Sequence, residues 1–226
     1  MKVQFLIAFL ASSIFCYSQK DFISIQFNPI YNSLPIALGK KYPYKTDSIE
    51  ITTLKFYIST IQFYQENELV DEFIKKHFLI DIENPQSLIL TQANKKNKKF
   101  NHIHFSIGVD SINNTAGALG DDLDPTNGMY WTWQSGYINF KLEGNSKLCP
   151  SRKNQFTFHI GGYQYPNNTF QNLDFKISNQ NKIEIDLNIA QLFNQINLKE
   201  LYEVMSPNKK AMEMATKIKA AFSITN

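Results

Sequence analysis

A long run of apolar, β-branched and aromatic residues, IEITTLKFYISTIQFYQ, occupies positions 49–65. Such a composition is typical of an extended strand, because β-branched and aromatic side chains pack well on a pleated sheet. Aromatic residues make up 14% of the 226-residue chain, with 18 Phe and 11 Tyr, so the same preference extends beyond this run. The chain is therefore expected to fold mainly from strands, and its length suits one large β domain.

Further strands are predicted at intervals, separated by turn signals, as in a sandwich or a barrel. They cover residues 22–27, 79–82, 88–90, 100–110, 130–144, 155–160, 170–177 and 182–189. Helix is expected only near the C-terminus, where Ser206 and Pro207 form an N-cap and first-turn pair for residues 207–222 and where residues 189–193 can form one turn. The predicted fold class is all-β: an antiparallel β-sandwich with a long Trp-bearing loop and a short C-terminal helix.

The N-terminus has the pattern of a secretory signal peptide. A charged start precedes an apolar run over residues 3–15, and Cys16 and Ser18 supply small residues before a cleavage site. We expect cleavage after Ser18, which leaves residues 19–226 as a single exported domain, periplasmic or secreted. The alternative is a lipoprotein anchored through Cys16, and the bulky Phe15 before that cysteine argues against it.

Charge and cysteine content narrow the classes of function. The net charge of +3 is too small and too dispersed to indicate a nucleic-acid partner. No segment after the signal is apolar enough to predict a membrane helix. Cleavage would leave Cys149 as the single cysteine, so no intramolecular disulfide is expected. Its side chain can be a buried hydrophobe, a copper-binding thiolate or an intermolecular pairing site.

Three of the four histidines avoid the apolar face of their own predicted strand. His102 and His104 lie on the polar face of residues 100–110, with backbones roughly 6–7 Å apart. His159 lies on the polar face of residues 155–160. If these strands are neighbours, three imidazoles can share one ion, and imidazole suits copper and zinc alike. The alternatives are a surface His-x-His pair and a hydrogen-bonded structural histidine.

The most distinctive segment is GDDLDPTNGMYWTWQSGYINFKLEG, residues 120–144. Its Asp-Pro-Thr-Asn-Gly turn signal leads directly into a strand that carries both tryptophans of the chain, Trp131 and Trp133, on one face. Two interpretations stay open: core packing at a loop-to-strand corner, and an aromatic wall beside a ligand or redox centre. The acidic residues before the turn lack the spacing of a calcium-binding hand and are interpreted as a hydrogen-bonded turn.

Several motifs together resemble the MbnP-like (methanobactin-associated copper-binding) family. The most specific is LDPTNGMYWTWQSGY at 123–137; weaker matches follow the expected order, with LKFYIS at 54–59, FSIGV at 105–109, LEG at 142–144 and FHIG at 158–161. The resemblance implies an exported, β-rich protein that binds copper through two histidines and a tryptophan oxidised to kynurenine. It also implies, for some members, a dihaem, peroxidase-like partner of the MauG type that performs this oxidation.

Carried over to this sequence, the resemblance selects His104 and His159 as copper ligands, with His102 as a third candidate. A family member has a Trp-x-His arrangement; here His102 occupies the Trp position, so Trp131 and Trp133 become the candidates for oxidation. We therefore predict a non-catalytic, exported copper-binding protein for copper acquisition, storage or electron transfer. The alternative is an extracellular binding or adhesion module that uses the aromatic loop; no catalytic constellation indicates an enzyme.

Overall fold

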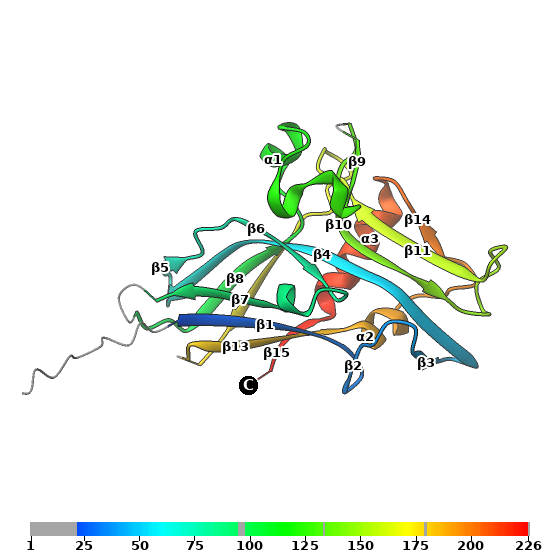
Figure 1. Cartoon of the computed structure of the whole chain (residues 1–226), viewed down its shortest axis with the longest axis horizontal. Coiled ribbons are helices and arrows are strands. Elements are labelled where there is room, and N and C mark those ends of the chain that lie inside the picture. Colours follow the sequence, from blue (N-terminus) through cyan, green and yellow to red (C-terminus); the bar gives the residue numbers. More distant parts are fainter. Residues whose placement is uncertain (1–21, 95–97, 133, 179, 226) are drawn as a thin grey trace, which may run out of the picture.

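The computed structural model describes residues 22–94, 98–132, 134–178 and 180–225. The predicted signal peptide, residues 1–18, lies outside the described residues, and so does Trp133. The described chain forms two stacked sheets with a few short helices, which confirms a mainly β sandwich (Figure 1).

The smaller sheet is built around β1 (Phe22–Tyr31). β13 (Lys182–Asn188) pairs with one edge of β1, β7 (Ile89–Ala93) and β2 (Leu34–Pro35) pair with the other, and β15 (Phe222–Thr225) pairs with β13. The β1–β13 pairing is parallel, as is a short pairing in the larger sheet. The sandwich is therefore mixed rather than antiparallel throughout. Parallel strands are joined by long crossover connections, and the local sequence pattern does not show which distant strands such a connection brings together.

The larger sheet is organised by the long strand β4 (Asp47–Gln65). One edge of β4 pairs with β3 (Lys41–Tyr44), β6 (His77–Asp81) and β5 (Glu68–Glu72). The other edge is shared end to end by β10 (Gly136–Asn145), which pairs with residues 50–56, and β8 (His102–Ile107), which pairs with residues 58–64. Two wings thus leave the same edge of β4. One continues from β10 to β11 (Gln155–Gly161) and β14 (Glu203–Val204), and the other from β8 to β12 (Gln171–Lys176).

Along this edge of β4, the pairing partner changes from β8 to β10 next to Gly108. The Gly108 backbone N–H donates to the Tyr57 carbonyl at 2.9 Å, and the next N–H, of Val109, donates to the Asn139 side-chain oxygen at 3.0 Å. A Cβ on residue 108 would lie 2.5 Å from the Asn139 side chain, and φ is +109°, so only glycine fits here. Asn139 lies at a bulge in β10 and fills the gap with a side-chain amide.

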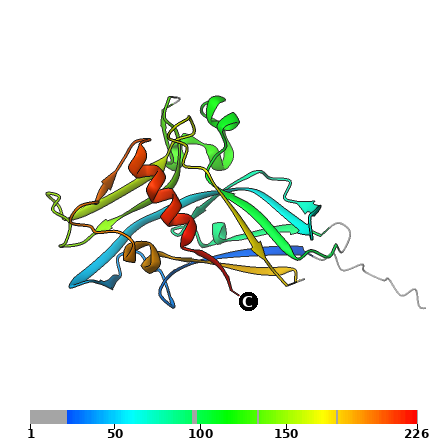
Figure 2. The same cartoon turned by 180° about the vertical axis from the view of Figure 1, so that it is seen from behind.

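Helix α3 (Lys209–Ala220) contacts both β11 and β12 and so packs between the two wings (Figure 2). It buries Ala211, Met214, Ala215 and Ile218. The predicted helix is confirmed, but its N-cap is Asn208, whose side chain accepts from the Ala211 N–H, rather than Ser206. Helix α2 (Ile189–Asn194) matches the predicted turn. Helix α1 (Ser111–Thr115), capped by Asp110, lies between the predicted strands 100–110 and 130–144, where no helix is expected from the sequence.

Aromatic side chains join the two sheets in the core. Phe56 of β4 is fully buried and meets Phe27 of β1 and Phe222 of β15 edge to face, with ring centroids 6.1 and 5.8 Å apart. The inner faces of both sheets are buried in this core. The polar residues of β8, β10 and β11 therefore lie on the outer face of the larger sheet. Among the residues that the structure describes, no helix is long and apolar enough to cross a membrane.

Candidate metal site on the outer face of the larger sheet

The structure places His104 and His159 in different wings. His104 pairs with Gln62 of β4, whereas His159 pairs with Lys141, which in turn pairs with Lys55 of β4. Seven residues of β4 separate the two positions, about 23 Å at about 3.3 Å per residue and somewhat less because the strand bulges between Ser59 and Gln62. Metal–imidazole bonds are only about 2 Å long. The predicted convergence of these imidazoles on one ion is therefore wrong, because β8 and β11 are not neighbouring strands.

His159 lies in the centre of a charged cluster on β10 and β11. Its Nε2 is 2.6 Å from Glu143 Oε1, and the residue is only 8% exposed. Thr53 Oγ1 donates to the other Glu143 oxygen at 3.0 Å, and Lys141 Nζ lies 3.8 Å from Glu143 Oε1. Lys141 also donates to the Gly128 carbonyl at 3.2 Å, which ties the cluster to the Trp-bearing loop.

The cluster sets the protonation state of His159. Burial lowers the pKa of the imidazole, and this outweighs the hydrogen bond with Glu143, which raises it. Burial works to raise the pKa of Glu143, but the hydrogen bond with His159, the Lys141 charge and the Thr53 hydrogen bond lower it overall. A neutral imidazole beside an ionised carboxylate must donate from Nε2, so Nδ1 carries the lone pair. That Nδ1 atom is buried and has no hydrogen-bond partner among the described residues.

An imidazole oriented in this way has the tautomer that is typical of metal-ligating histidines. Metal-ligating histidines generally donate one ring N–H to a carboxylate or carbonyl and coordinate through the other nitrogen. His159 has the first half of this arrangement, and its lone pair is unused. Imidazole nitrogen is a donor that copper accepts readily. Among the described residues, however, no group of three or more His, Cys, Asp or Glu side chains gathers around a common point.

Trp131 approaches the same surface from β9 (Tyr130–Thr132). A Cβ atom on Gly161 would lie 2.9 Å from Trp131 Cζ3, so the indole packs on the glycine two residues beyond His159. Alternate residues share a face of a strand, which puts the indole on the His159 side of β11. Trp131 is half-buried and joins a small apolar cluster with Met129 and Tyr137. The loop-to-strand corner therefore packs an aromatic side chain beside His159.

His102 and His104 form a separate pair on β8, as the alternation predicts. Both are half-buried on the outer face. His102 Nδ1 is 2.8 Å from the Asn101 side-chain oxygen, and His104 Nδ1 is 3.7 Å from Asp174 Oδ2 on the neighbouring strand β12. Each imidazole thus has an oxygen beside one ring nitrogen, and the pair is a second, weaker candidate for metal binding.

The structure changes the interpretation of three further residues that could belong to a functional site. Cys149 is buried and free, and burial raises the pKa of its thiol to about 11, which favours the hydrophobic interpretation over a thiolate ligand. His77, which no sequence signal marks, is held by Asp110, with Nε2 3.2 Å from the carboxylate. Glu143 is the most important residue that the sequence does not reveal, since its role appears only when β10 is paired with β11.

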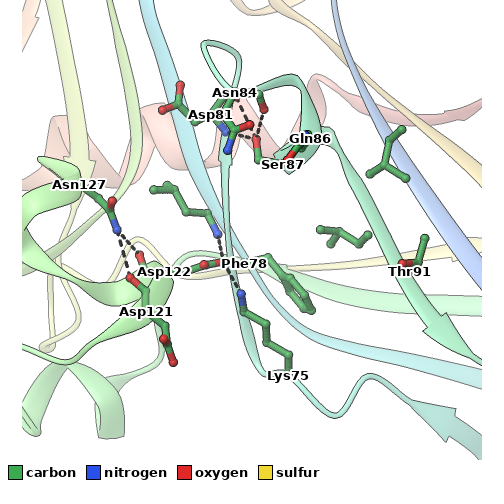
Figure 3. A pocket seen from close by; sticks show the side chains of 13 residues that line it. Lys75, Phe78, Asp81, Asn84, Gln86, Ser87, Thr91, Asp121, Asp122 and Asn127 are labelled. Atoms are coloured by element: carbon green, nitrogen blue, oxygen red, sulfur yellow. Dashed lines mark hydrogen bonds and ion pairs between the residues drawn. The ribbon is translucent and has the colours of Figure 1, made fainter.

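A hollow between β6 and the acidic loop lies away from the predicted ligands (Figure 3). It has a volume of about 440 Å³ and includes none of the predicted ligands. Its charges largely satisfy one another: Asp122 accepts from the Leu79 N–H at 2.8 Å and pairs with Lys75 at 2.9 Å, and the Asn127 side chain donates to the Asp122 carbonyl at 3.1 Å. These contacts support the interpretation of the acidic loop as a hydrogen-bonded turn.

Comparisons with known proteins agree with the fold. The structure is similar to that of MbnP from Methylosinus trichosporium, with a TM-score of 0.64 and 12% sequence identity over 86% of this chain and 87% of that one. A search of curated proteins finds no significant match. The family model MbnP matches residues 20–206, most of the chain. The chain therefore belongs to the MbnP family of methanobactin-associated, copper-related proteins.

Proposed function

We propose that the protein is an exported, non-catalytic copper-binding protein that holds one copper ion at His159. The observation that carries this proposal is the buried Nδ1 atom of His159, which has no hydrogen-bond partner among the described residues while Nε2 is occupied by Glu143. A buried polar atom without a partner is costly, and most such atoms in proteins are satisfied by protein, water or an ion. A copper ion on Nδ1 would remove this cost.

The surroundings of His159 support copper binding over a purely structural role for this imidazole. Glu143 would fix the ring orientation and increase the electron density on Nδ1. Trp131 would form an aromatic wall on one side, and it is the described candidate for oxidation to kynurenine by a MauG-type dihaem partner. Because Trp131 is half-buried, it is less suited to the alternative function of an adhesion module that uses exposed tryptophans.

Copper titration of the mature protein, residues 19–226, tests the proposal. Cu(I) is added anaerobically in competition with a chromophoric chelator, and the copper stoichiometry is measured for wild type, His159→Ala, His159→Gln and the double variant His102→Ala/His104→Ala. Far-UV circular dichroism checks that each variant is folded. We expect one copper per wild-type chain, retention in the β8 double variant, and loss in both His159 variants.

Two outcomes would overturn the proposed site. Loss of copper in the β8 variant together with retention in both His159 variants would move the site to the other wing. Full retention in every variant would reject His159 as the ligand and with it the proposed site. Intact-mass measurement after co-expression with a dihaem partner tests the accompanying oxidation, since conversion of Trp131 to kynurenine adds a small fixed mass that Trp131→Phe abolishes.

A further inference from the structure

Two contacts fix the path of the chain beside His159 on the side away from Glu143. β14 pairs with β11 in parallel, with Glu203 opposite Thr157 and Val204 opposite Phe158. Further along, a Cβ on Gly162 would lie 2.9 Å from Pro207 Cβ. The backbone between Val204 and Pro207 therefore runs alongside residues 158–162, and Met205 is the residue that comes next in register to His159.

The alternation of side chains places Met205 on the same face as His159. Phe158 and its partner Val204 are both buried in the core, so the residues that follow them, His159 and Met205, point to the outer face. Neighbouring strands lie about 4.8 Å apart, which is within reach of these two long side chains. Met205 is 48% exposed, so its thioether is not consumed by core packing. The described methionines Met129 and Met214, by contrast, are fully buried.

We infer that the thioether of Met205 is a second copper ligand beside His159 Nδ1 and that it makes the site selective for Cu(I). The inference rests on the proposed copper site and adds its second donor. Thioether sulfur is a soft ligand that favours Cu(I), whereas zinc and Cu(II) are bound well by imidazole and oxygen. The flexible methionine side chain adapts to an ion that approaches from solvent.

The test combines a sulfur-specific readout with a size-matched substitution. Met205→Leu keeps the apolar bulk and removes the sulfur, and Met212→Leu on α3 is the matched control. The methionine methyl groups are labelled with ¹³C in the mature protein and followed by NMR during titration with Cu(I), and Cu(I) and Cu(II) affinities are measured for each variant. Loss of an outer-shell partner already costs roughly 10–100-fold in metal affinity. Loss of a ligand should cost at least as much, and for Cu(I) only.

The expected result is a shift of the Met205 methyl signal on Cu(I) addition, together with weaker Cu(I) binding in Met205→Leu and unchanged binding in Met212→Leu. If His159→Ala abolishes copper binding while Met205→Leu leaves both the affinity and the spectrum of bound protein unchanged, the role of Met205 is rejected and the histidine site stands. If neither substitution affects copper, both proposals fail. If Met205→Leu weakens binding and His159→Ala does not, the pairing of these two ligands is refuted.

Discussion

The hydrogen bond between Glu143 and His159 should be a measurable source of stability even without metal. The two atoms are 2.6 Å apart, and the side chains are 30% and 10% exposed. A hydrogen bond that involves a charged group contributes about 1.5–3 kcal/mol when buried. Because Glu143 keeps partial contact with solvent, which screens its charge, we expect a coupling energy of about 1–2 kcal/mol. That is a substantial fraction of the 5–15 kcal/mol typical of whole-protein stability.

A double-mutant cycle measures this coupling. Urea unfolding of Glu143→Ala, His159→Ala and the double variant gives three changes in the free energy of unfolding, and their non-additivity is the coupling energy. The control is the same cycle on Lys209 and Glu213, an exposed pair on α3 at 3.9 Å, for which about 0–0.5 kcal/mol is expected. Equal coupling energies in the two cycles would show that Glu143 does not hold the imidazole, and the derived tautomer would lose its basis.

Two further predictions concern the core and the pH dependence of stability. Phe56→Ala should lower the free energy of unfolding by about 3–5 kcal/mol, because it opens a cavity between the sheets. The control Ile112→Ala removes a side chain that is 82% exposed and should change this free energy by less than about 0.5 kcal/mol. Comparable losses for the two variants in urea unfolding would contradict the placement of the core. The lowered pKa of His159 means that the unfolded chain binds its proton first as pH falls below 6.5, so stability should decline from pH 6.5 towards 4.5, where the Glu143 carboxylate begins to contribute. His159→Gln should flatten the unfolding free energy over that interval, and an unchanged slope would show that another group titrates.

Side-chain alternation along single strands could be predicted from the sequence, and the neighbours of those strands could not. The faces taken by His102, His104 and His159 follow from the local pattern of apolar residues, and the structure confirms them. Which strands lie side by side depends on pairings between distant segments. The sharing of one β4 edge by β8 and β10 depends on Gly108 and Asn139, whose contact no periodicity indicates.

Short-range sequence signals account for some, but not all, details of the helices and of the site. The Ser206–Pro207 pair predicts the C-terminal helix, but Ser206 and Asn208 are both good N-cap residues, and the structure shows that Asn208 takes this position. Helix α1 had its own signal in Asp110, a favourable N-cap that the Gly- and Asp-rich surroundings obscured. Glu143 could have been found by pairing β10 with β11 as an antiparallel hairpin, since that register brings it within reach of His159.

The shared edge of β4 has a consequence for how changes spread through the protein. The β10–β11 wing, which carries His159, and the β8–β12 wing, which carries His102 and His104, meet each other mainly through β4 and α3. Helix α3 contacts both β11 and β12, so the packing of each wing depends on the position of the same helix. Met214 and Ile218 lie on the buried side of α3, so a substitution at either position should loosen the packing of both wings at once.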